Sequence, residues 1–64
     1  MIIVECISIR ESMPDQIKVG TKYKLDPATI EGDSDGDWYG TIYDMNVCKI
    51  GRLMLKHFKS VESM

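Results

Sequence analysis

The densest group of candidate ligand atoms is the acidic run Asp33-Ser34-Asp35-Gly36-Asp37, which is followed by Asp44. Its carboxylates fall at positions one, three, five and twelve of a calcium-binding loop, and Ca²⁺ prefers such closely spaced oxygen ligands. The other details of such a loop are missing. Trp38 stands where the loop needs its turn glycine, Asp44 is shorter than the usual bidentate Glu, and no flanking helices are expected. The run therefore predicts a solvated hairpin tip without a metal, turned at Asp35-Gly36.

Aromatic side chains follow the acidic run at Trp38, Tyr39 and Tyr43. In a β-strand successive side chains point to opposite faces, so Tyr39 and Tyr43 share one face and Trp38 lies on the other. One face is expected to join the core, and the other could form an aromatic platform for a peptide. The first candidate binding surface therefore combines acidic and aromatic residues: Glu31, Asp33, Asp35, Asp37, Trp38, Tyr39 and Tyr43.

A basic segment near the end of the chain consists of Arg52, Lys56, His57 and Lys59 around an apolar Leu53-Met54-Leu55 run. One interpretation is a docking surface for an acidic partner or for nucleic acid. The other, which we favour, is that Leu53, Leu55 and Phe58 close the open end of a small barrel while the charged side chains are solvated. The basic residues are kept as the alternative binding surface.

Catalytic signatures are missing from the chain. It has no glycine-rich phosphate loop, no Ser-His-Asp set in a recognisable context, and a single histidine, His57. A chain this short also has little room for a concave pocket of about 300 Å³ or more. Two cysteines and one histidine without CxxC or HxxxH spacing do not form a structural zinc site. We expect a protein that is not an enzyme and needs no cofactor.

The charges of the chain are nearly balanced but segregated. Eight Lys and Arg residues against ten Asp and Glu give a formal net charge of −2. That balance argues against a sequence-independent DNA-binding protein, which neutralises phosphates with clustered Lys and Arg. Residues 26–44 hold six acidic residues and no basic one, whereas residues 49–59 hold four Lys and Arg, His57 and no acidic residue. Such segregation can steer a charged partner.

Cys6 and Cys48 both lie in apolar runs, and both are expected to be reduced and buried as small hydrophobic residues. The N-terminus does not resemble a signal peptide, because its apolar run starts at Ile2, is interrupted by Glu5, and has no basic region before it. We therefore expect a cytoplasmic protein that does not contact a membrane.

Alternating and β-branched residues predict a chain made mostly of strands, over residues 2–9, 17–25, 38–45, 47–50 and 59–61. The first is nearly continuous in apolar character, as expected for a strand covered on both faces. Asp26-Pro27 is expected to end the second strand, and Gly51 to break the fourth. Loops are expected at residues 10–16 and 28–37. Gly20 predicts a positive φ angle, and residues 52–58 suffice for one helical or 3₁₀ turn.

Five short strands with one helical or 3₁₀ turn before the last give the element order of a small, mostly β, five-stranded SH3-like barrel. Closing the sheet removes its exposed edges, the main hazard of an all-β chain this small. The length of 64 residues supports one domain, residues 1–64, with a single small core.

The motifs occur in a characteristic order: an apolar strand with Val-x-Cys-Ile, a variable loop, Ile-x-x-Gly-x-x-Tyr, an acidic loop, an aromatic strand and a final Phe-x-x-Val. In this order the chain resembles small SH3-like β-barrel proteins encoded by phages and prophages of Gram-positive bacteria. The matching residues are Val4, Cys6, Ile7, Ile17, Gly20, Tyr23, Trp38, Phe58 and Val61.

The chain departs from this family in two respects. The loops at residues 10–16 and 28–36 are longer than usual, and segment 51–57 is basic and apolar where family members often carry aromatic and acidic residues. The resemblance implies a small phage-type accessory protein that acts by binding, in the cytoplasm of a bacterial host cell.

The leading hypothesis is thus a protein-binding module that engages a host protein and modulates or inhibits it. Its acidic loop at residues 31–37 could mimic nucleic acid by presenting carboxylates where phosphates would lie. The first alternative is nucleic-acid binding through Lys18, Lys22, Lys24 and segment 52–59. The second is a structural role, as a subunit of a larger assembly or as a homodimer.

Overall fold

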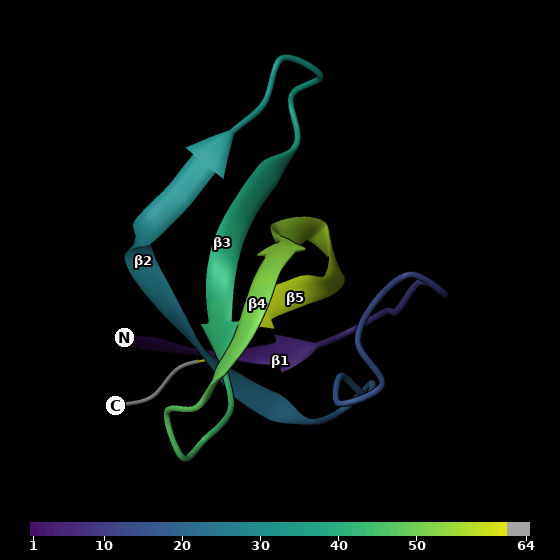
Figure 1. Cartoon of the computed structure of the whole chain (residues 1–64), viewed down its shortest axis with the longest axis vertical. Helices are drawn as coiled ribbons and strands as arrows, with labels where there is room; N and C mark the ends of the chain where they lie inside the picture. Colours follow the sequence, from purple (N-terminus) through teal and green to yellow (C-terminus); the bar gives the residue numbers. More distant parts are fainter. Residues whose placement is uncertain (62–64) are drawn as a thin grey trace.

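The structure is a computed structural model that describes residues 1–61, and it consists almost wholly of β-structure. The elements are β1 (Ile2–Cys6), β2 (Lys22–Gly32), β3 (Trp38–Tyr43), β4 (Lys49–Met54), a 3₁₀ turn η1 (Leu55–His57) and β5 (Phe58–Ser60). The strands form one antiparallel sheet in the order β4-β3-β2-β1-β5 (Figure 1). The prediction of a mostly β fold with one 3₁₀ turn before the last strand is confirmed. No helix in residues 1–61 has the length and apolar character needed to cross a membrane.

The strand β2 bends where the sequence predicts that it ends. It passes through Asp26-Pro27 and continues to Gly32, so the prediction that Asp26-Pro27 terminates a strand is wrong. Its pairing with β3 passes from Asp26↔Thr41 to Glu31↔Tyr39, which is five steps along β2 (26 to 31) for two along β3 (41 to 39). The extra residues bulge out of the ladder. Proline is tolerated there because it has no amide to leave unpaired.

Side-chain hydrogen bonds hold the bulge. Asp26 Oδ1 accepts the amide of Ala28 at 3.0 Å. The Thr29 hydroxyl donates to the Asp26 carbonyl at 2.7 Å and accepts the amide of Thr41 at 2.8 Å. Because Thr41 is buried, an unpaired amide there would be costly, and the Thr29 side chain supplies the missing acceptor.

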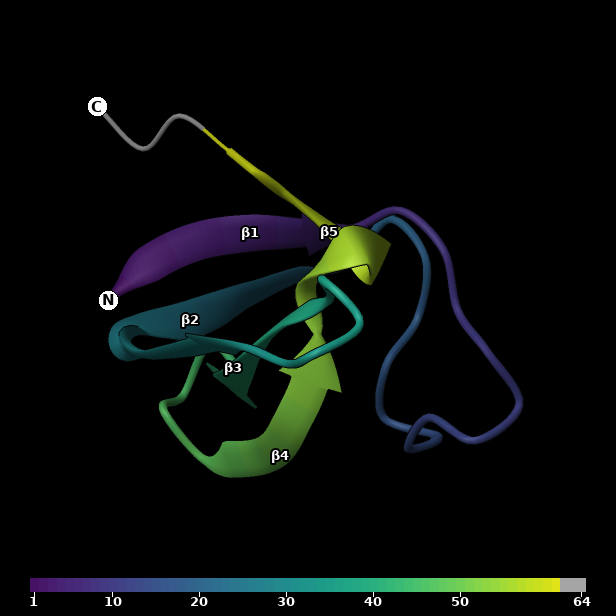
Figure 2. The ribbon, with the colours of Figure 1, turned by 90° about the horizontal axis from the view of Figure 1, so that it is seen from above.

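The bend lets the sheet curl around a single core. The first half of β2 pairs with both β1 and β3, its second half pairs with β3 alone, and β1 also pairs with β5. The turn η1 then joins β4 to β5, the two ends of the sheet (Figure 2). This arrangement is that of a small SH3-like barrel.

The core is small, as the chain length predicts. Its buried hydrophobic residues are Val4, Cys6, Ile17, Tyr23, Leu25, Ile42 and Phe58. Leu53 and Leu55 pack against this cluster, which supports the favoured interpretation that the apolar part of segment 52–58 closes the barrel. The rings of Tyr23 and Phe58 meet edge to face with centroids 6.1 Å apart. Val4 and Cys6 are buried on one face of β1, whereas Ile3 and Glu5 on the other face are only half-buried, so β1 is not covered on both faces as expected.

Residues 7–21 form one long loop, so the predicted strand at 2–9 ends too late and the predicted strand at 17–25 begins too early. Ile7, Ile9 and Val19 are each about half exposed. Their β-branched side chains are the reason that a strand was predicted here. Such side chains are frequent in strands because they pack well on a half-buried sheet, and not because their backbone prefers the strand conformation by itself. Whether these residues form a strand depends on where the segment lies in the tertiary structure, which a single sequence does not show.

The barrel anchors this loop at two points. The Tyr23 hydroxyl donates to the Gln16 carbonyl at 2.9 Å and accepts the Lys18 amide at 2.9 Å. Between these contacts, the side chain of Ile17 is buried in the core. Gly20 has a φ of 88°, as predicted, and its amide donates to the Cys6 carbonyl at 2.8 Å. The loop is therefore fixed along its second half.

The turn between β3 and β4 is organised by Asp44, whose Oδ1 accepts the amides of Asn46 at 2.8 Å and Cys48 at 2.9 Å. Within this turn Val47 has a φ of 64°. β-branched residues rarely adopt this left-handed conformation, because the Cβ substituents crowd the backbone. The Val47 side chain is 50% exposed, so little burial compensates for the strain.

The strand β4 begins after this turn and runs through Gly51 to Met54, so the prediction of a strand at 47–50 broken by Gly51 is wrong. Gly51 has a φ of 153° and pairs with Ile42, whereas the neighbouring pair is Tyr43↔Lys49. Ile50 is therefore the extra residue of a β-bulge. The glycine permits the irregularity without ending the strand.

Replacing Val47 by Gly is expected to stabilise the fold by about 1 kcal/mol, because glycine takes a positive φ without steric cost. Urea denaturation followed by Trp38 fluorescence measures the change. Val47→Ala is the control, since alanine retains a Cβ and most of the strain. A denaturation midpoint for Val47→Gly no higher than that of the unaltered chain would contradict the expectation.

Candidate functional site

The acidic loop at residues 33–37 forms the tip of the β2–β3 hairpin and projects from the barrel (Figure 1). Asp33 organises the tip: its Oδ1 accepts the amides of Asp35 at 3.0 Å and Asp37 at 2.9 Å, and its own amide donates to the Asp37 carbonyl at 2.9 Å. Gly36 has a φ of 87°, consistent with the predicted turn at Asp35-Gly36. The loop is shorter than the predicted 28–37, because residues 28–32 belong to β2.

Trp38 and Tyr39 occupy successive positions at the start of β3 and so lie on opposite faces. The Trp38 ring lies over Gly32, where an added Cβ would come within 3.3 Å of it, and the side chain is 58% exposed. Tyr39 is half-buried beside the acidic tip. Partial burial raises the pKa of the Tyr39 phenol, and the negative charges of Asp33, Asp37 and Asp35 raise it further. Tyr39 and the tip therefore form one surface.

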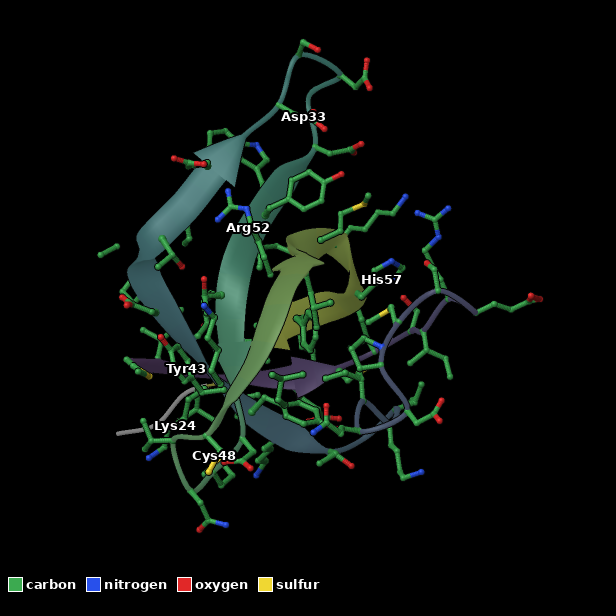
Figure 3. All side chains as sticks on the ribbon, in the orientation of Figure 1. Lys24, Asp33, Tyr43, Cys48, Arg52 and His57 are labelled. Atoms are coloured by element: carbon green, nitrogen blue, oxygen red, sulfur yellow. The ribbon has the colours of Figure 1, made fainter. Side chains whose placement is uncertain are left out.

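Arg52 joins this acidic surface and does not belong to a separate basic one. A hollow of about 400 Å³ under the tip is lined by Glu31, Gly32, Asp33, Tyr39 and Arg52. The Arg52 guanidinium donates to Glu31 Oε1 at 2.8 Å and to the Thr29 carbonyl at 3.1 Å (Figure 3). Arg52 thus clamps β4 to the second half of β2. Both charged side chains are well exposed, so the ion pair contributes at most about 1 kcal/mol.

Tyr43 lies away from Tyr39, at the other end of β3 (Figure 3). The strand register places it between Lys24 of β2 and Lys49 of β4. Residues directly opposite each other on neighbouring strands share a face. The structure therefore separates Tyr43 from the acidic candidate surface and gives it two lysine neighbours.

The same face carries further lysines. Lys22 and Lys59 lie opposite Glu5 of β1, one on each side of it. Lys56 is exposed on η1. The predicted basic segment is thus divided among three places: Arg52 at the hairpin, Lys59 on the sheet, and Lys56 with His57 on η1.

His57 is buried, with only 5% of its surface exposed. Its Nδ1 lies 2.8 Å from the Ser8 hydroxyl, and its carbonyl accepts the Ile7 amide at 2.8 Å. Its Nε2 is also buried and has no hydrogen-bond partner within the described residues. Burial lowers the pKa of the imidazole, and the nearby charges of Lys56 and Arg10 lower it further. His57 is therefore neutral at pH 7 and does not add to a cationic surface.

The two cysteines differ. Cys6 is fully buried, as predicted, whereas Cys48 is exposed, so the prediction for Cys48 is wrong. Cys48 falls in the turn held by Asp44 and not in the returning strand. Burial raises the pKa of the Cys6 thiol, and a backbone hydrogen bond from Ser8 opposes this only in part. Over residues 1–61, no three His, Cys, Asp or Glu side chains lie where they could hold a metal ion.

Of the residues that the sequence grouped, the structure keeps Tyr39 beside the acidic tip, places Trp38 on the opposite face and moves Tyr43 to the other end of β3. The structure adds Arg52 to the acidic surface and adds Lys24 and Lys49 to Tyr43. The contacts that produce these groupings join residues far apart in the chain. Comparison with protein-family models, with curated proteins and with solved structures finds no match to this chain.

The single histidine predicts how stability depends on pH. The unfolded chain binds a proton at His57 near pH 6.5, whereas the folded chain keeps this imidazole neutral to lower pH. The unfolded state therefore takes up more protons in this window, and the free energy of unfolding falls as pH decreases from about 7.5 through 6.5 towards the folded pKa. Urea denaturation at pH 7.5, 6.5 and 5.5 measures the decline. His57→Gln should flatten it, and an equal decline in that variant would contradict the assignment.

Proposed function

We propose that this chain is a non-catalytic protein-binding module whose contact surface is the tip of the β2–β3 hairpin with Tyr39. The observation that carries the proposal is the preformed tip. Asp33 fixes the backbone of the loop through its carboxylate. The side chains of Asp35 and Asp37 make no hydrogen bond or ion pair with any other described residue. A loop that is ordered before binding loses little conformational entropy on binding.

A basic surface on the partner suits this tip. Arg52 pairs with Glu31, so the negative field of the hairpin comes mainly from Asp33, Asp35 and Asp37. Carboxylates held on a projecting turn can take positions that phosphates would occupy in a basic cleft. Tyr39, directly beside them, offers an aromatic anchor of the kind enriched at interfaces. This combination supports the mimicry of nucleic acid.

The resemblance to phage-encoded SH3-like proteins supports a host protein as the partner, bound in the bacterial cytoplasm and modulated or inhibited by occupation of its basic site. The chain's own site residues take no part in bond-making in this proposal. Their function is to present charge and an aromatic ring in a fixed geometry.

Neutralising the tip is expected to weaken partner binding. Asp35→Asn with Asp37→Asn removes two charges and keeps Asp33, which the turn needs, so the affinity at low salt should fall about tenfold. The tagged protein is used to capture the partner from bacterial lysate at low and high salt. Titration of the purified partner then gives the dissociation constants of the unaltered and altered chains.

The matched control is Glu11→Gln with Asp15→Asn, which removes the same charge from the long loop, where both residues are exposed. It should bind the partner as the unaltered chain does. Equal weakening by both double variants would mean that net charge alone matters. No loss in the hairpin variant would exclude the tip as the contact surface.

The row Lys24–Tyr43–Lys49 favours a second candidate function, binding of single-stranded nucleic acid. Single strands are held by stacking of bases on aromatic rings beside basic groups. Here Tyr43 is flanked on both sides by lysines, and Lys22 and Lys59 extend the basic face. The negative net charge of the chain opposes this candidate.

Fluorescence anisotropy with a labelled oligothymidylate tests the second candidate. If it holds, Lys24→Gln with Lys49→Gln should reduce the slope of log affinity against log salt by about 1.4, because two phosphate contacts are lost. Lys18→Gln with Lys56→Gln is the control, and it should leave the slope unchanged. No measurable binding at low salt would discard this function.

A further inference from the structure

The outer face of strands β2, β3 and β4 is the side of the sheet that points away from the core. Leu25 and Ile42 are buried on the core side, so the residues next to them in the chain belong to the outer face. The strand register arranges the outer residues in three rows across the sheet: Glu31–Tyr39–Met54, Asp26–Thr41–Arg52 and Lys24–Tyr43–Lys49.

This outer face carries opposite charges at its two ends. The row with Tyr39 adjoins the acidic tip, whereas the row with Tyr43 has a lysine on each side. Figure 3 shows Asp33 at one end of the face, Lys24 and Tyr43 at the other end, and Arg52 between them. One continuous sheet face therefore has an acidic end and a basic end.

The charges at the two ends are free, whereas those in the middle row are engaged. Within residues 1–61, the ammonium groups of Lys24 and Lys49 form no ion pair, and neither do the carboxylates of Asp35 and Asp37. In the middle row, the Asp26 carboxylate accepts the Ala28 amide, and Arg52 donates to Glu31 and to the Thr29 carbonyl. Unused charge is thus concentrated at the ends.

The two ends are too far apart to neutralise each other within one chain. Tyr39 and Tyr43 are four positions apart on β3, which corresponds to about 13 Å at the usual rise of a strand. Charges in solution are largely screened beyond about 8 Å at physiological ionic strength. Each end therefore needs a charge from another molecule.

A second copy of the chain matches both ends at once. A nucleic acid laid along β3 would be attracted by the basic end and repelled by the acidic end. A second copy presents both signs at the same spacing. A twofold axis that lies in the plane of the face and crosses β3 near Thr41 places the acidic end of each copy on the basic end of the other. Such a self-complementary patch is what a twofold interface requires.

We propose that the chain forms an antiparallel homodimer through this outer face, with the acidic tip of each copy between Lys24 and Lys49 of the other. These lysines lie on either side of Tyr43, so their Cα atoms are two strand spacings apart, about 10 Å. The tip is narrower, because Asp33 and Asp37 are paired directly across it. The Tyr43 hydroxyl, between the two lysines, can donate a hydrogen bond to a carboxylate of the tip.

The dimer goes beyond the proposed function and would regulate it. Because the tip is covered in the dimer, a basic partner must compete with the second copy for the same carboxylates. The dimer itself needs no partner, so it can be tested on the purified chain alone. Lys24→Gln with Lys49→Gln should abolish the dimer and leave the partner bound at least as tightly, which separates the two proposals.

Sedimentation velocity of the purified chain at increasing concentration, in low and high salt, tests the dimer. We expect the mass to rise from one chain to two at low salt and to return towards one chain at high salt, because salt screens the contacts. A mass of one chain up to the concentrations used for NMR would overturn the proposal. Growth beyond two chains would also overturn it, since that indicates head-to-tail stacking.

Charge reversal locates the contact. Lys24→Glu with Lys49→Glu gives a face with two acidic ends, and Asp35→Lys with Asp37→Lys gives a face with two basic ends. Each double variant alone should raise the dissociation constant of the dimer at least about tenfold. An equimolar mixture of the two should form a dimer with one chain of each kind, which native mass spectrometry identifies. Failure of the mixture to dimerise would contradict the proposal.

Lys18→Glu with Lys56→Glu is the matched control. Both lysines are exposed and lie outside the outer face, so this variant has the same change in net charge and should dimerise as the unaltered chain does. A ¹H–¹⁵N spectrum of every variant establishes that it is folded. A labelled oligothymidylate is titrated separately. If the chain binds it through Lys24 and Lys49 and stays a monomer without it, the basic end is a nucleic-acid site and the dimer is wrong.

Discussion

The bend in β2 is the constraint on which the rest of the structure depends. A sheet this small can surround a core only if one strand serves two parts of it, and β2 does so by pairing with β1 and β3 before the bend and with β3 alone after it. The bend leaves no buried amide unpaired at Thr41, because the Thr29 hydroxyl accepts a hydrogen bond from it. The bend also carries Glu31 to a position where Arg52 of β4 can reach it. The acidic hairpin owes its place on the barrel to these contacts.

The long loop depends on the barrel in a similar way. Tyr23 and Ile17 fix its second half, and the Ser8–His57 contact fixes its start against η1. Between these points the turn at Arg10–Met13 is held out over the end of the sheet, and the space beneath it is the cavity that His57 lines.

The sequence predicts the structure correctly at positions where interactions between neighbouring residues determine the backbone conformation. Gly20 and Gly36 take the positive φ angles that their positions predict, and the aromatic strand β3 and the 3₁₀ turn are where the pattern indicates. The predictions at Pro27 and Gly51 are wrong because each residue breaks a regular strand but fits a bulge, and a bulge depends on the partner strand. The pairs Ser8–His57 and Arg52–Glu31 join residues 49 and 21 positions apart. No single-sequence pattern reports such contacts, so the buried state of His57 and the pairing of Arg52 became visible only in the fold.

The Arg52–Glu31 ion pair ties the acidic tip to the end of the barrel. Arg52 lines the hollow under the tip and also the hollow next to Leu53 and His57. Its guanidinium donates to Glu31 and to the Thr29 carbonyl at once, and so it holds the second half of β2 against β4. An exposed pair worth little in stability can therefore still fix where the hairpin lies.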